Sequence, residues 1–395
     1  MTQEKSEVSK FAAEAGRKVE YAKGLEGVIL TESSLSFVDG LAGKLIYRGV
    51  PIQELAEYST FEETTYFLMF GEFPKKDELE KFDQKLKQNR ILPPELLNMI
   101  KMFPKTAHPM EALRTGVSIL GMLDTNKEDI SRETNIERAI QLIAKFATIV
   151  AAFNRHRNGK DFVAPNLNFN HAKNFLYMLR GKEPSELEAK AMDVGFILHA
   201  DHEMNASTLS CRVVVSSLSD IYSAVTAGVG SLKGPLHGGA NEEVMKMLGE
   251  IGGVDKTEAW IKDALSNKKK ISGFGHRVYK YYDPRAAILK SYAEKFAEVR
   301  KDMKEWLEMA KLIEKIMIET LGEAKGIYPN VDFYSGLIYS AMDIPMDLFT
   351  PIFAISRITG WTCQILEQLV DNRIYRPRAI YIGSIDAHYV PMDKR

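Results

Sequence analysis

The chain has 395 residues, of which 45% are hydrophobic and 27% are charged, and its formal net charge is −1. This length suits two domains, or one large domain with a smaller partner. The balanced charge gives no overall preference for nucleic acid or for a membrane surface. No stretch approaches the roughly 18 consecutive apolar residues of a membrane span. We therefore expect neither a nucleic-acid partner nor a membrane partner.

The N-terminal segment and the two cysteines indicate the cellular compartment in which the protein is expected. Residues 1–24 lack the apolar core of a signal peptide, and their glutamates are not typical of an organelle transit sequence. Cys211 and Cys363 both lie in apolar segments with a helical pattern. They predict small buried thiols in a reducing compartment, so the expected location is cytoplasmic.

The first elements combine a hairpin with helices. In residues 25–48, β-branched alternation is broken by "DG" and "AG", which predicts a small hairpin. Ser59 and Glu62 form a capping-box pattern before an apolar run that stops at Gly71. Residues 75–88 then place apolar side chains on one stripe, so two consecutive helices are expected.

Helical patterns dominate the rest of the chain. Ser185 and Glu188 form a second capping box, and the helix after them runs towards "HADHE". Residues 206–232 mix small and apolar side chains with few charges, as in buried, closely packed helices. Residues 286–322 and most of 347–370 are also helical in pattern. The predicted fold class is therefore all-α with a short N-terminal β-hairpin, and any second domain is an insertion rather than a tethered unit.

Two histidines lie in "LHADHEMNAST". His202 follows Leu198 by four residues, so it continues the apolar stripe of that helix and should point inward, as many structural core histidines do. His199 and His202 could share a face as metal ligands, but no neighbouring cysteine or HExxH motif completes such a site. We expect no metal.

His237 lies in "KGPLHGGAN", a loop whose glycines allow a ligand to approach the backbone closely. Asn241 and the glutamates after it indicate a helix start, and the positive end of a helix dipole disfavours protonation of a nearby histidine. A neutral imidazole could polarise a carbonyl or stabilise an enol, as the neutral active-site histidine of triosephosphate isomerase does. The alternative is a tight turn in which His237 has only a capping role.

Residues 267–286, "NKKKISGFGHRVYKYYDPRA", form a local basic cluster that suits an anion. Asp283 and Pro284 have the pattern of an N-cap and a first helical residue, which places Arg285 in the first turn, where a cation is disfavoured unless it holds an anion. A solvated charged face is the alternative for the lysines. The basic residues are Lys268, Lys269, Lys270, Arg277, Lys280 and Arg285.

Further candidate groups lie towards the C-terminus. Asp332 is set among apolar and aromatic residues in "NVDFYSG", where its pKa would be raised and it could act as a general base, although an Asp in a first helical turn is also favourable for stability alone. Arg357 interrupts an apolar helix, and Arg376 and Arg378 flank a proline. Arginines of this kind suit the binding of a dicarboxylate.

Taken in order, "LHADHEMNAST", "GPLHGGANEEV", "GFGHRVYKYYDPRA", "NVDFYSG" and "NRIYRPRA" resemble the citrate synthase family, in its shorter bacterial and archaeal form, from about Gly24 to the C-terminus. The resemblance implies a helical homodimer that undergoes domain closure. It implies a large domain, residues 1–238 and 344–395, for dimerisation and oxaloacetate, and an inserted small domain, residues 239–343, for CoA and the catalytic aspartate.

The implied activity is an acyl transfer that condenses acetyl-CoA with oxaloacetate and water, in the tricarboxylic acid cycle, with no tightly bound cofactor. Matching motif by motif, the base is Asp332, the donor to the enol is His237 and the donor to the oxaloacetate carbonyl is His276. The implied oxaloacetate ligands are His202, Arg285, Arg357 and, across the dimer, Arg376. The implied CoA contacts are Ile271, Gly273, Phe274, Gly275 and Lys280.

Several alternatives stay open at this point. A 2-methylcitrate synthase would use propionyl-CoA with the same groups, and one methylene in an acyl pocket is worth only about 1–3 kcal/mol. A non-catalytic CoA or dicarboxylate binder would keep the fold, and a metal-dependent hydrolase would rest on His199 and His202. Arg376 and Arg378 both fit the C-terminal motif, so their roles could be exchanged.

Overall fold

The computed structural model describes residues 22–126, 129–379, 384 and 387–395. The chain divides into two compact units, one formed by Met1–Glu32 with Ile374–Arg395 and the other by Ser33–Arg373. The described part of the first unit contains two short 3-10 helices, η1 (Lys23–Leu25) and η4 (Met392–Lys394). The second unit contains the sheet and the longer helices of the described residues.

A small antiparallel sheet opens the second unit. Its strands are β1 (Ser36–Asp39), β2 (Lys44–Tyr47) and β3 (Val50–Pro51), in the order β1-β2-β3, with Ser36 opposite Tyr47. The predicted hairpin is confirmed, and β3 adds a third strand that the pattern did not indicate.

Eight helices follow the sheet: α2 (Ile52–Tyr58), α3 (Phe61–Phe70), α4 (Lys76–Asn89), α5 (Pro94–Ile100), α6 (Pro109–Leu123), α7 (Arg132–Arg157), α8 (His171–Arg180) and α9 (Glu186–His199). The predicted capping box at Ser59 was wrong by one position. Thr60 is the N-cap of α3, and its side chain accepts from the backbone N–H of Glu63, while the Ser59 hydroxyl donates to the Glu63 carboxylate. The capping box of Ser185 and Glu188 at the start of α9 is confirmed.

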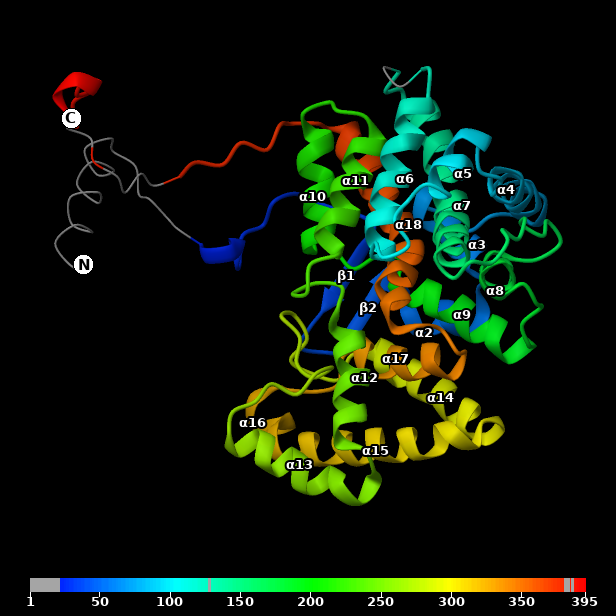
Figure 1. Ribbon diagram of the computed structural model, residues 1–395, viewed down its shortest axis with the longest axis vertical. Helices are drawn as coiled ribbons and strands as arrows, with labels where there is room; N and C mark the ends of the chain where they lie inside the picture. Colours follow the sequence, from blue (N-terminus) through cyan, green and yellow to red (C-terminus); the bar gives the residue numbers. More distant parts are fainter. Residues whose placement is uncertain (1–21, 127–128, 380–383, 385–386) are drawn as a thin grey trace. The chain divides into compact units, whose positions relative to one another are not determined.

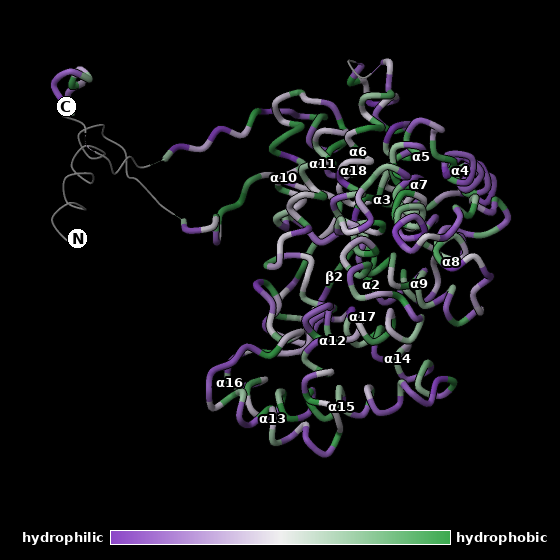
Figure 2. Tube along the Cα trace, in the orientation of Figure 1, coloured by the Kyte–Doolittle hydropathy of each residue, from purple (hydrophilic) through white to green (hydrophobic). Residues whose placement is uncertain are grey.

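Three helices, α10 (Ala206–Ser216), α11 (Ile221–Leu232) and α18 (Phe349–Val370), complete the core of this part of the unit. The helix α18 packs against α7, α9, α10 and α11, and nearly all of its residues are buried. By contrast α4 buries only Phe82 and Leu86, and its trace is mostly hydrophilic in Figure 2. The predicted buried helices of residues 206–232 are confirmed.

The segment between α11 and α18 contains α12 (Ala240–Ile251), α13 (Val254–Ser266), α14 (Pro284–Val299), α15 (Lys301–Met317), the π-helix η2 (Ile318–Gly322), α16 (Glu323–Lys325), α17 (Val331–Ala341) and the 3-10 helix η3 (Met346–Leu348). Within the second unit these elements lie together, below the remaining helices in Figure 1. That residues 239–343 move as a separate small domain stays a prediction.

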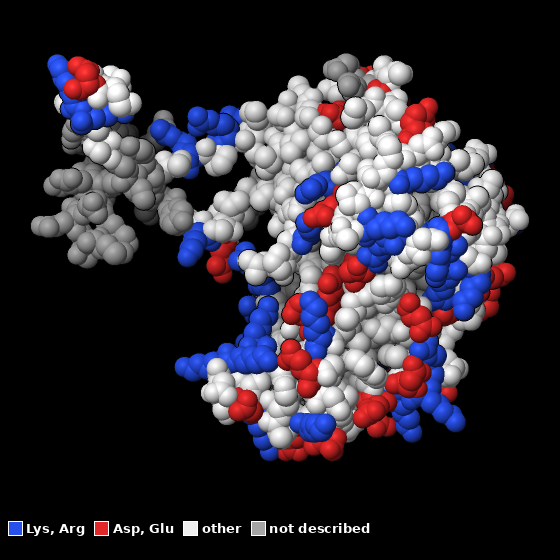
Figure 3. All heavy atoms as spheres, in the orientation of Figure 1, with Lys and Arg blue, Asp and Glu red and all other residues white. Residues whose placement is uncertain are grey.

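The surface charges and the two cysteines are placed as the sequence predicts. Figure 3 shows acidic and basic side chains interspersed over the face in view, with basic side chains gathered at the left of its lower half. Cys211 and Cys363 are free and buried, as predicted. Among the described residues, no helix has the length and apolar character needed to cross a membrane.

Candidate active site

His237 lies in the loop between α11 and α12, and the structure fixes its ring by contact with Ser207. The ring nitrogen Nε2 lies 2.8 Å from the Ser207 hydroxyl and accepts the Ser207 backbone N–H at 3.3 Å. The next residue must be glycine, because a Cβ atom at Gly238 would lie 2.3 Å from the carbonyl oxygen of Leu232. The loop therefore packs too tightly for a side chain at the position directly after His237.

The electrostatics of His237 keep its imidazole neutral. Burial is the largest cause that lowers its pKa, to about 4, and the positive charge of Arg357 adds to it. The predicted helix start near Asn241 is confirmed to within one residue, because α12 begins at Ala240, with Gly239 rather than Asn241 as its N-cap. The helix terminus that contacts His237 is that of α10, since Ser207 lies in its first turn.

His202, Tyr279 and His276 form a second cluster. The prediction that His202 continues the α9 stripe was wrong, because α9 ends at His199 and His202 lies in the segment after it. His202 is nevertheless buried, as expected, and its Nε2 lies 3.3 Å from the Tyr279 hydroxyl. The ring centroids of His202 and His276 are 5.2 Å apart. Burial, then the charge of Arg285, lowers the pKa of His202 well below its ordinary value.

His276 is held in one tautomer by its own loop. Its Nδ1 accepts the backbone N–H groups of Val278 at 3.0 Å and Tyr279 at 3.2 Å. Burial, followed by the charge of Arg285, lowers its pKa to about 4. A neutral ring whose Nδ1 accepts carries its hydrogen on Nε2, so His276 can donate a hydrogen bond from that atom.

His199 has a structural environment. Its Nδ1 donates to the carbonyl oxygen of Gly195 at 2.8 Å, and its ring packs against Phe353 with centroids 4.7 Å apart. Within the described ranges, no group of three or more His, Cys, Asp and Glu side chains is placed to hold a metal ion.

Arg285 lies in the first turn of α14, as predicted, and is paired with the N-cap residue Asp283. Its Nη2 lies 2.8 Å from the Asp283 carboxylate, and both side chains are almost fully buried. The same Asp283 carboxylate accepts the backbone N–H of Val331, the first residue of α17, at 3.2 Å. Asp283 therefore connects the start of α14 to the start of α17. Burial disfavours the charge of Arg285, but Asp283 more than offsets this and raises its pKa.

Asp332 lies in the first turn of α17, after the N-cap residue Asn330, whose side chain accepts the Asp332 backbone N–H at 3.0 Å. Burial is the largest effect on its carboxyl group and raises its pKa to about 6, while the charges of Arg285 and Arg357 partly oppose the rise. Such a carboxylate is a stronger base than an exposed aspartate and is still mostly ionised at neutral pH.

Arg357 is buried in the middle of α18, with 1% of its surface exposed. Its Nε donates to the carbonyl oxygen of His199 at 2.7 Å, and its guanidinium carbon lies 4.6 Å from the centre of the Phe353 ring. No ion pair with an acid is formed by Arg357 in the part of the chain that the structure describes. Burial lowers its pKa to about 10, so the guanidinium stays charged and has capacity for an anionic ligand.

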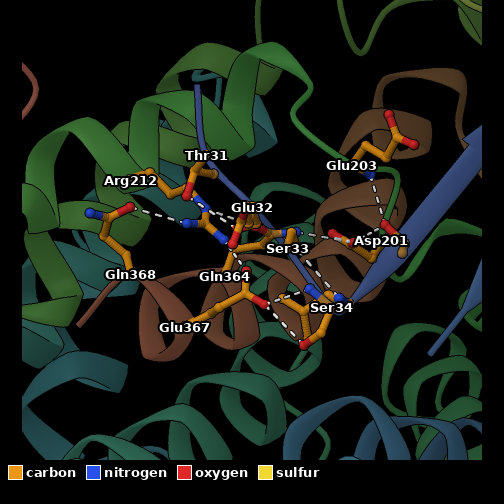
Figure 4. A network of polar contacts seen from close by, with 12 residues as sticks. Thr31, Glu32, Ser33, Ser34, Asp201, Glu203, Arg212, Gln364, Glu367 and Gln368 are labelled. Atoms are coloured by element: carbon orange, nitrogen blue, oxygen red, sulfur yellow. Dashed lines mark hydrogen bonds and ion pairs between the residues drawn. The ribbon is translucent and has the colours of Figure 1, made fainter. Parts of the chain in front are cut away.

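A buried polar network supports the segment that carries His202 (Figure 4). Asp201 accepts hydrogen bonds from the Ser36 hydroxyl and, at 3.3 Å, from the Gln364 side chain. Gln364 in turn accepts from Arg212 at 2.8 Å, and Arg212 pairs with Glu367. The network thus joins β1, α10 and α18 to the residue beside His202.

The helix α18 also approaches this segment closely at Gly360. Its backbone N–H donates to the carbonyl oxygen of Ala200 at 3.0 Å, and a Cβ atom there would lie 2.3 Å from the same oxygen. This contact allows Arg357, one turn earlier, to reach the end of α9.

The predicted CoA loop pairs with the segment just before Asp332. The backbone N–H of Gly275 donates to the carbonyl oxygen of Tyr328, and that of Asn330 donates to the carbonyl oxygen of Gly273, both at 2.9 Å. The Phe274 ring lies 4.7 Å from that of Phe333. Ile271 and Phe274 are buried, whereas Lys280 is exposed.

Most of the predicted site residues are linked by the charges of two buried arginines. Arg357 acts on the pKa of Asp332, His237 and His202, and Arg285 acts on that of Asp332, His202 and His276. Arg376 and Arg378 are exposed and belong to the other compact unit, so their predicted roles are not tested.

Sequence reasoning missed three supporting residues: Ser207, Tyr279 and Asp201. Of these only Ser207 had a usable signal, because "NAST" has the pattern of a helix start and its first-turn N–H groups need acceptors. Tyr279 and Asp201 act through contacts with segments remote in sequence.

The comparisons with known proteins agree over nearly the whole chain. The family model described as "Citrate synthase, C-terminal domain" matches residues 24–378. A citrate synthase from Deinococcus radiodurans is 52% identical over 95% of this chain and 99% of that relative, and one from Haloferax volcanii is 48% identical over the same shares. The solved citrate synthase of Thermoplasma acidophilum, a ternary complex with carboxymethyl coenzyme A and oxaloacetate, superposes with a TM-score of 0.91 at 34% identity, covering 96% of this chain and all of that one.

With this site on an all-α fold, these comparisons define an enzyme of the acyltransferase type. The chain belongs to the citrate synthase family. The names of its relatives support citrate synthase activity and do not favour the 2-methylcitrate synthase alternative.

Proposed function

We propose that this site condenses acetyl-CoA with oxaloacetate and water to give citrate and CoA, with Asp332, His237 and His276 as the catalytic residues. The observation that carries the proposal is the combination of one carboxylate of raised pKa with two imidazoles of lowered pKa, where Arg357 acts on His237, Arg285 acts on His276 and both act on Asp332. A thioester methyl is a weak acid, so a base and a neutral hydrogen-bond donor must act on it together.

The first step forms the enol of acetyl-CoA. Asp332 removes a proton from the methyl group, and His237 donates a hydrogen bond from Nδ1 to the thioester oxygen. The Nδ1 position follows from the contact with Ser207, because a ring nitrogen that accepts a backbone N–H carries no hydrogen of its own. The donor then faces away from Ser207.

The second step forms the new carbon–carbon bond. The enol carbon attacks the ketone carbon of oxaloacetate, and His276 donates from Nε2 to the ketone oxygen, which becomes the hydroxyl of the product. Water then cleaves the thioester, which releases CoA as the thiol and leaves a third carboxylate on citrate. Positioning of the electrophile reduces the entropic cost of the step.

We propose His202, Arg285 and Arg357 as oxaloacetate ligands, together with Arg376 of a partner subunit in a homodimer. Arg357 supports this role because it is buried, charged and without a carboxylate partner among the described residues. For CoA we propose Ile271, Gly273, Phe274, Gly275 and Lys280. Closure of residues 239–343 over the site would exclude water until condensation is complete.

No metal and no tightly bound cofactor enter the proposed reaction, and the proposed setting is the tricarboxylic acid cycle in the cytoplasm. The two buried free thiols are compatible with a reducing compartment.

A thiol-release assay combined with detection of citrate tests the proposal. We expect release of CoA to require both acetyl-CoA and oxaloacetate, to yield one citrate per thiol, and to survive dialysis against a chelator. Thiol release without citrate would overturn the proposal. So would a loss of activity after dialysis against a chelator that is reversed by adding a divalent metal ion. Propionyl-CoA in the same assay measures the acyl preference as a ratio of kcat/KM values.

A further inference from the structure

One cavity of the second unit is lined by none of the proposed catalytic or substrate-binding residues. It has a volume of about 620 Å³ and is formed by the α4–α5 connection, the end of α6, one face of α7 and the start of α11. This volume is within the range of small-molecule sites, roughly 300–1,000 Å³. Its apolar lining includes Ile91, Leu92, Leu120 and Leu142.

Lys145 lines this cavity, and its side chain is mostly buried. Only 8% of its surface is exposed. It shares one face of α7 with Arg138 and Gln141, at helical spacing, and all three line the cavity. Among the described residues, no hydrogen bond or ion pair is formed by its amino group.

The other charged groups that line the cavity are already neutralised. Arg138 lies 2.7 Å from the Asp124 carboxylate, which also accepts the Tyr222 hydroxyl at 3.1 Å. Glu137 pairs with Lys85. Lys145 is therefore the remaining uncompensated charge of the site, and burial of a lone cation is costly.

We propose that Lys145 is an acyl-acceptor site, at which an acyl thioester such as acetyl-CoA modifies the side-chain amine without a second enzyme. The cavity provides access to the amine, and acylation converts an unpaired buried cation into a neutral amide. The product suits a lining that is largely apolar.

The chemistry balances without an oxidant or another reactant. The neutral amine attacks the thioester carbonyl carbon, a carbon–nitrogen bond forms, and the carbon–sulfur bond breaks. The thiolate leaves as CoA and takes up a proton, while the nitrogen loses one to water. The products are acetyl-lysine and free CoA.

Burial makes the neutral amine available for this attack. It lowers the pKa of Lys145 to about 8, with no compensating acid. At pH 8 a lysine of ordinary pKa is neutral in only a few molecules per thousand, so the neutral fraction of Lys145 is roughly 100-fold higher. Reduced access and lower basicity will offset part of this advantage.

The choice of acetyl-CoA as donor rests on the proposed function, since that substrate would be present at the enzyme. The site itself is independent of that function. An Asp332→Asn variant should lose citrate formation and keep acylation of Lys145, which separates failure of one proposal from failure of the other.

The test incubates the full-length protein with acetyl-CoA, without oxaloacetate, and measures acetylation of each lysine by mass spectrometry over time. Lys101 and Lys105, which are exposed, are the internal references. We expect Lys145 to react at least about tenfold faster than either reference at pH 8, and its rate to fall only about fivefold at pH 7, whereas the reference rates fall about tenfold. Equal rates at all three lysines would overturn the proposal.

A non-covalent role is the competing outcome. Thermal shifts with inorganic phosphate and with acetate would be compared between the native protein and a Lys145→Met variant, with Lys105→Met as the matched control. A shift that only Lys145→Met abolishes, with no preferential acetylation, would mean that the cavity holds an anion and would overturn the acyl-acceptor proposal.

Discussion

The ring nitrogen Nε2 of His237 lies 2.8 Å from the hydroxyl oxygen of Ser207 and 3.3 Å from the backbone nitrogen of the same residue. The Ser207 hydroxyl also accepts the indole N–H of Trp361 at 3.1 Å. The N–H group at the start of α10 thus selects the His237 tautomer, and the Ser207 hydroxyl is held beside the ring by Trp361 and by Asn205, whose Oδ1 lies 2.8 Å away.

Replacement of Ser207 by alanine should weaken catalysis without abolishing it. The backbone N–H still contacts His237, but the hydroxyl is lost and the buried Trp361 N–H loses its acceptor. We expect kcat to fall about tenfold and stability to fall by about 1–3 kcal/mol, the usual cost of an unsatisfied buried donor. Steady-state kinetics and denaturant unfolding measure the two effects.

Ser210→Ala is the matched control, because Ser210 lies one turn further along α10 and its hydroxyl donates to the carbonyl oxygen of Ala206. It should leave kcat unchanged. If Ser207→Ala had the same kcat as this control, the hydroxyl would have no part in orienting His237.

Asp332→Asn should abolish turnover and stabilise the fold. Activity should fall by several orders of magnitude, since an amide cannot remove the methyl proton. The folded-state pKa of about 6 is above the ordinary value of 3.8, so the ionised carboxylate destabilises the folded state. Stability of the native protein should therefore fall as pH rises from about 4 to 6, and above pH 6 the variant should be more stable by on the order of 2 kcal/mol.

The pH dependence of kcat/KM provides a second measurement. It should decline below about pH 6 in the native protein, as Asp332 takes up a proton. Asp255→Asn, an exposed first-turn residue of α13, is the control; it should leave activity unchanged and lower stability by less than about 1 kcal/mol, the loss of a favourable charge at a helix start. Wild-type turnover in Asp332→Asn would contradict the base role.

The sequence was sufficient to predict groups whose role depends on local pattern. Asp283 as an N-cap, Arg285 in the first turn and Asp332 in a first turn with raised pKa all follow from neighbours a few residues away. The all-α fold and the N-terminal hairpin were also predictable, because hydrophobic period and turn residues are local signals.

Tertiary contacts limited the remaining predictions. His202 lies beyond α9, in a segment fixed by Asp201, Ser36 and Gln364, and these three residues are far apart in the sequence. The backbone N–H that contacts His237 comes from the start of α10, a helix about 30 residues earlier in the chain. Neither arrangement has a signature within one window of the chain.

Subunit mixing should test whether Arg376 acts across a dimer. Asp332→Ala and Arg376→Ala should each be nearly inactive alone. In a mixed dimer, one site would combine intact Asp332 from one chain with intact Arg376 from the other, so activity should return to about a quarter of the native level after random reassociation. Activity of the mixture after mild denaturation and refolding is the measurement.

Arg378→Ala, mixed in the same way, is the comparison, because Arg376 and Arg378 both fit the C-terminal motif. Recovery with Arg378→Ala, while Arg376→Ala keeps native activity, would exchange their roles. If neither mixture recovers activity although sedimentation shows mixed dimers, each site is complete within one chain and the cross-subunit proposal fails.

Lys145→Met should stabilise the protein at neutral pH. The folded-state pKa of about 8 is below the ordinary value of 10.5, so the folded state binds the proton less tightly than the unfolded chain does. Stability of the native protein should therefore rise with pH between about 8 and 10.5. Below pH 8 the lysine is charged, so the folded state carries the full free-energy cost of the buried charge. An apolar side chain of similar length removes this cost and should stabilise the folded state by on the order of 2 kcal/mol at pH 7.

Lys105→Met, at an exposed position, is the control and should change stability by less than about 0.5 kcal/mol. Urea unfolding at pH 7 and pH 10 measures the difference in free energy of unfolding between Lys145→Met and the native protein. This difference should be smaller at pH 10. An equal difference at both pH values would contradict an unpaired buried charge at Lys145.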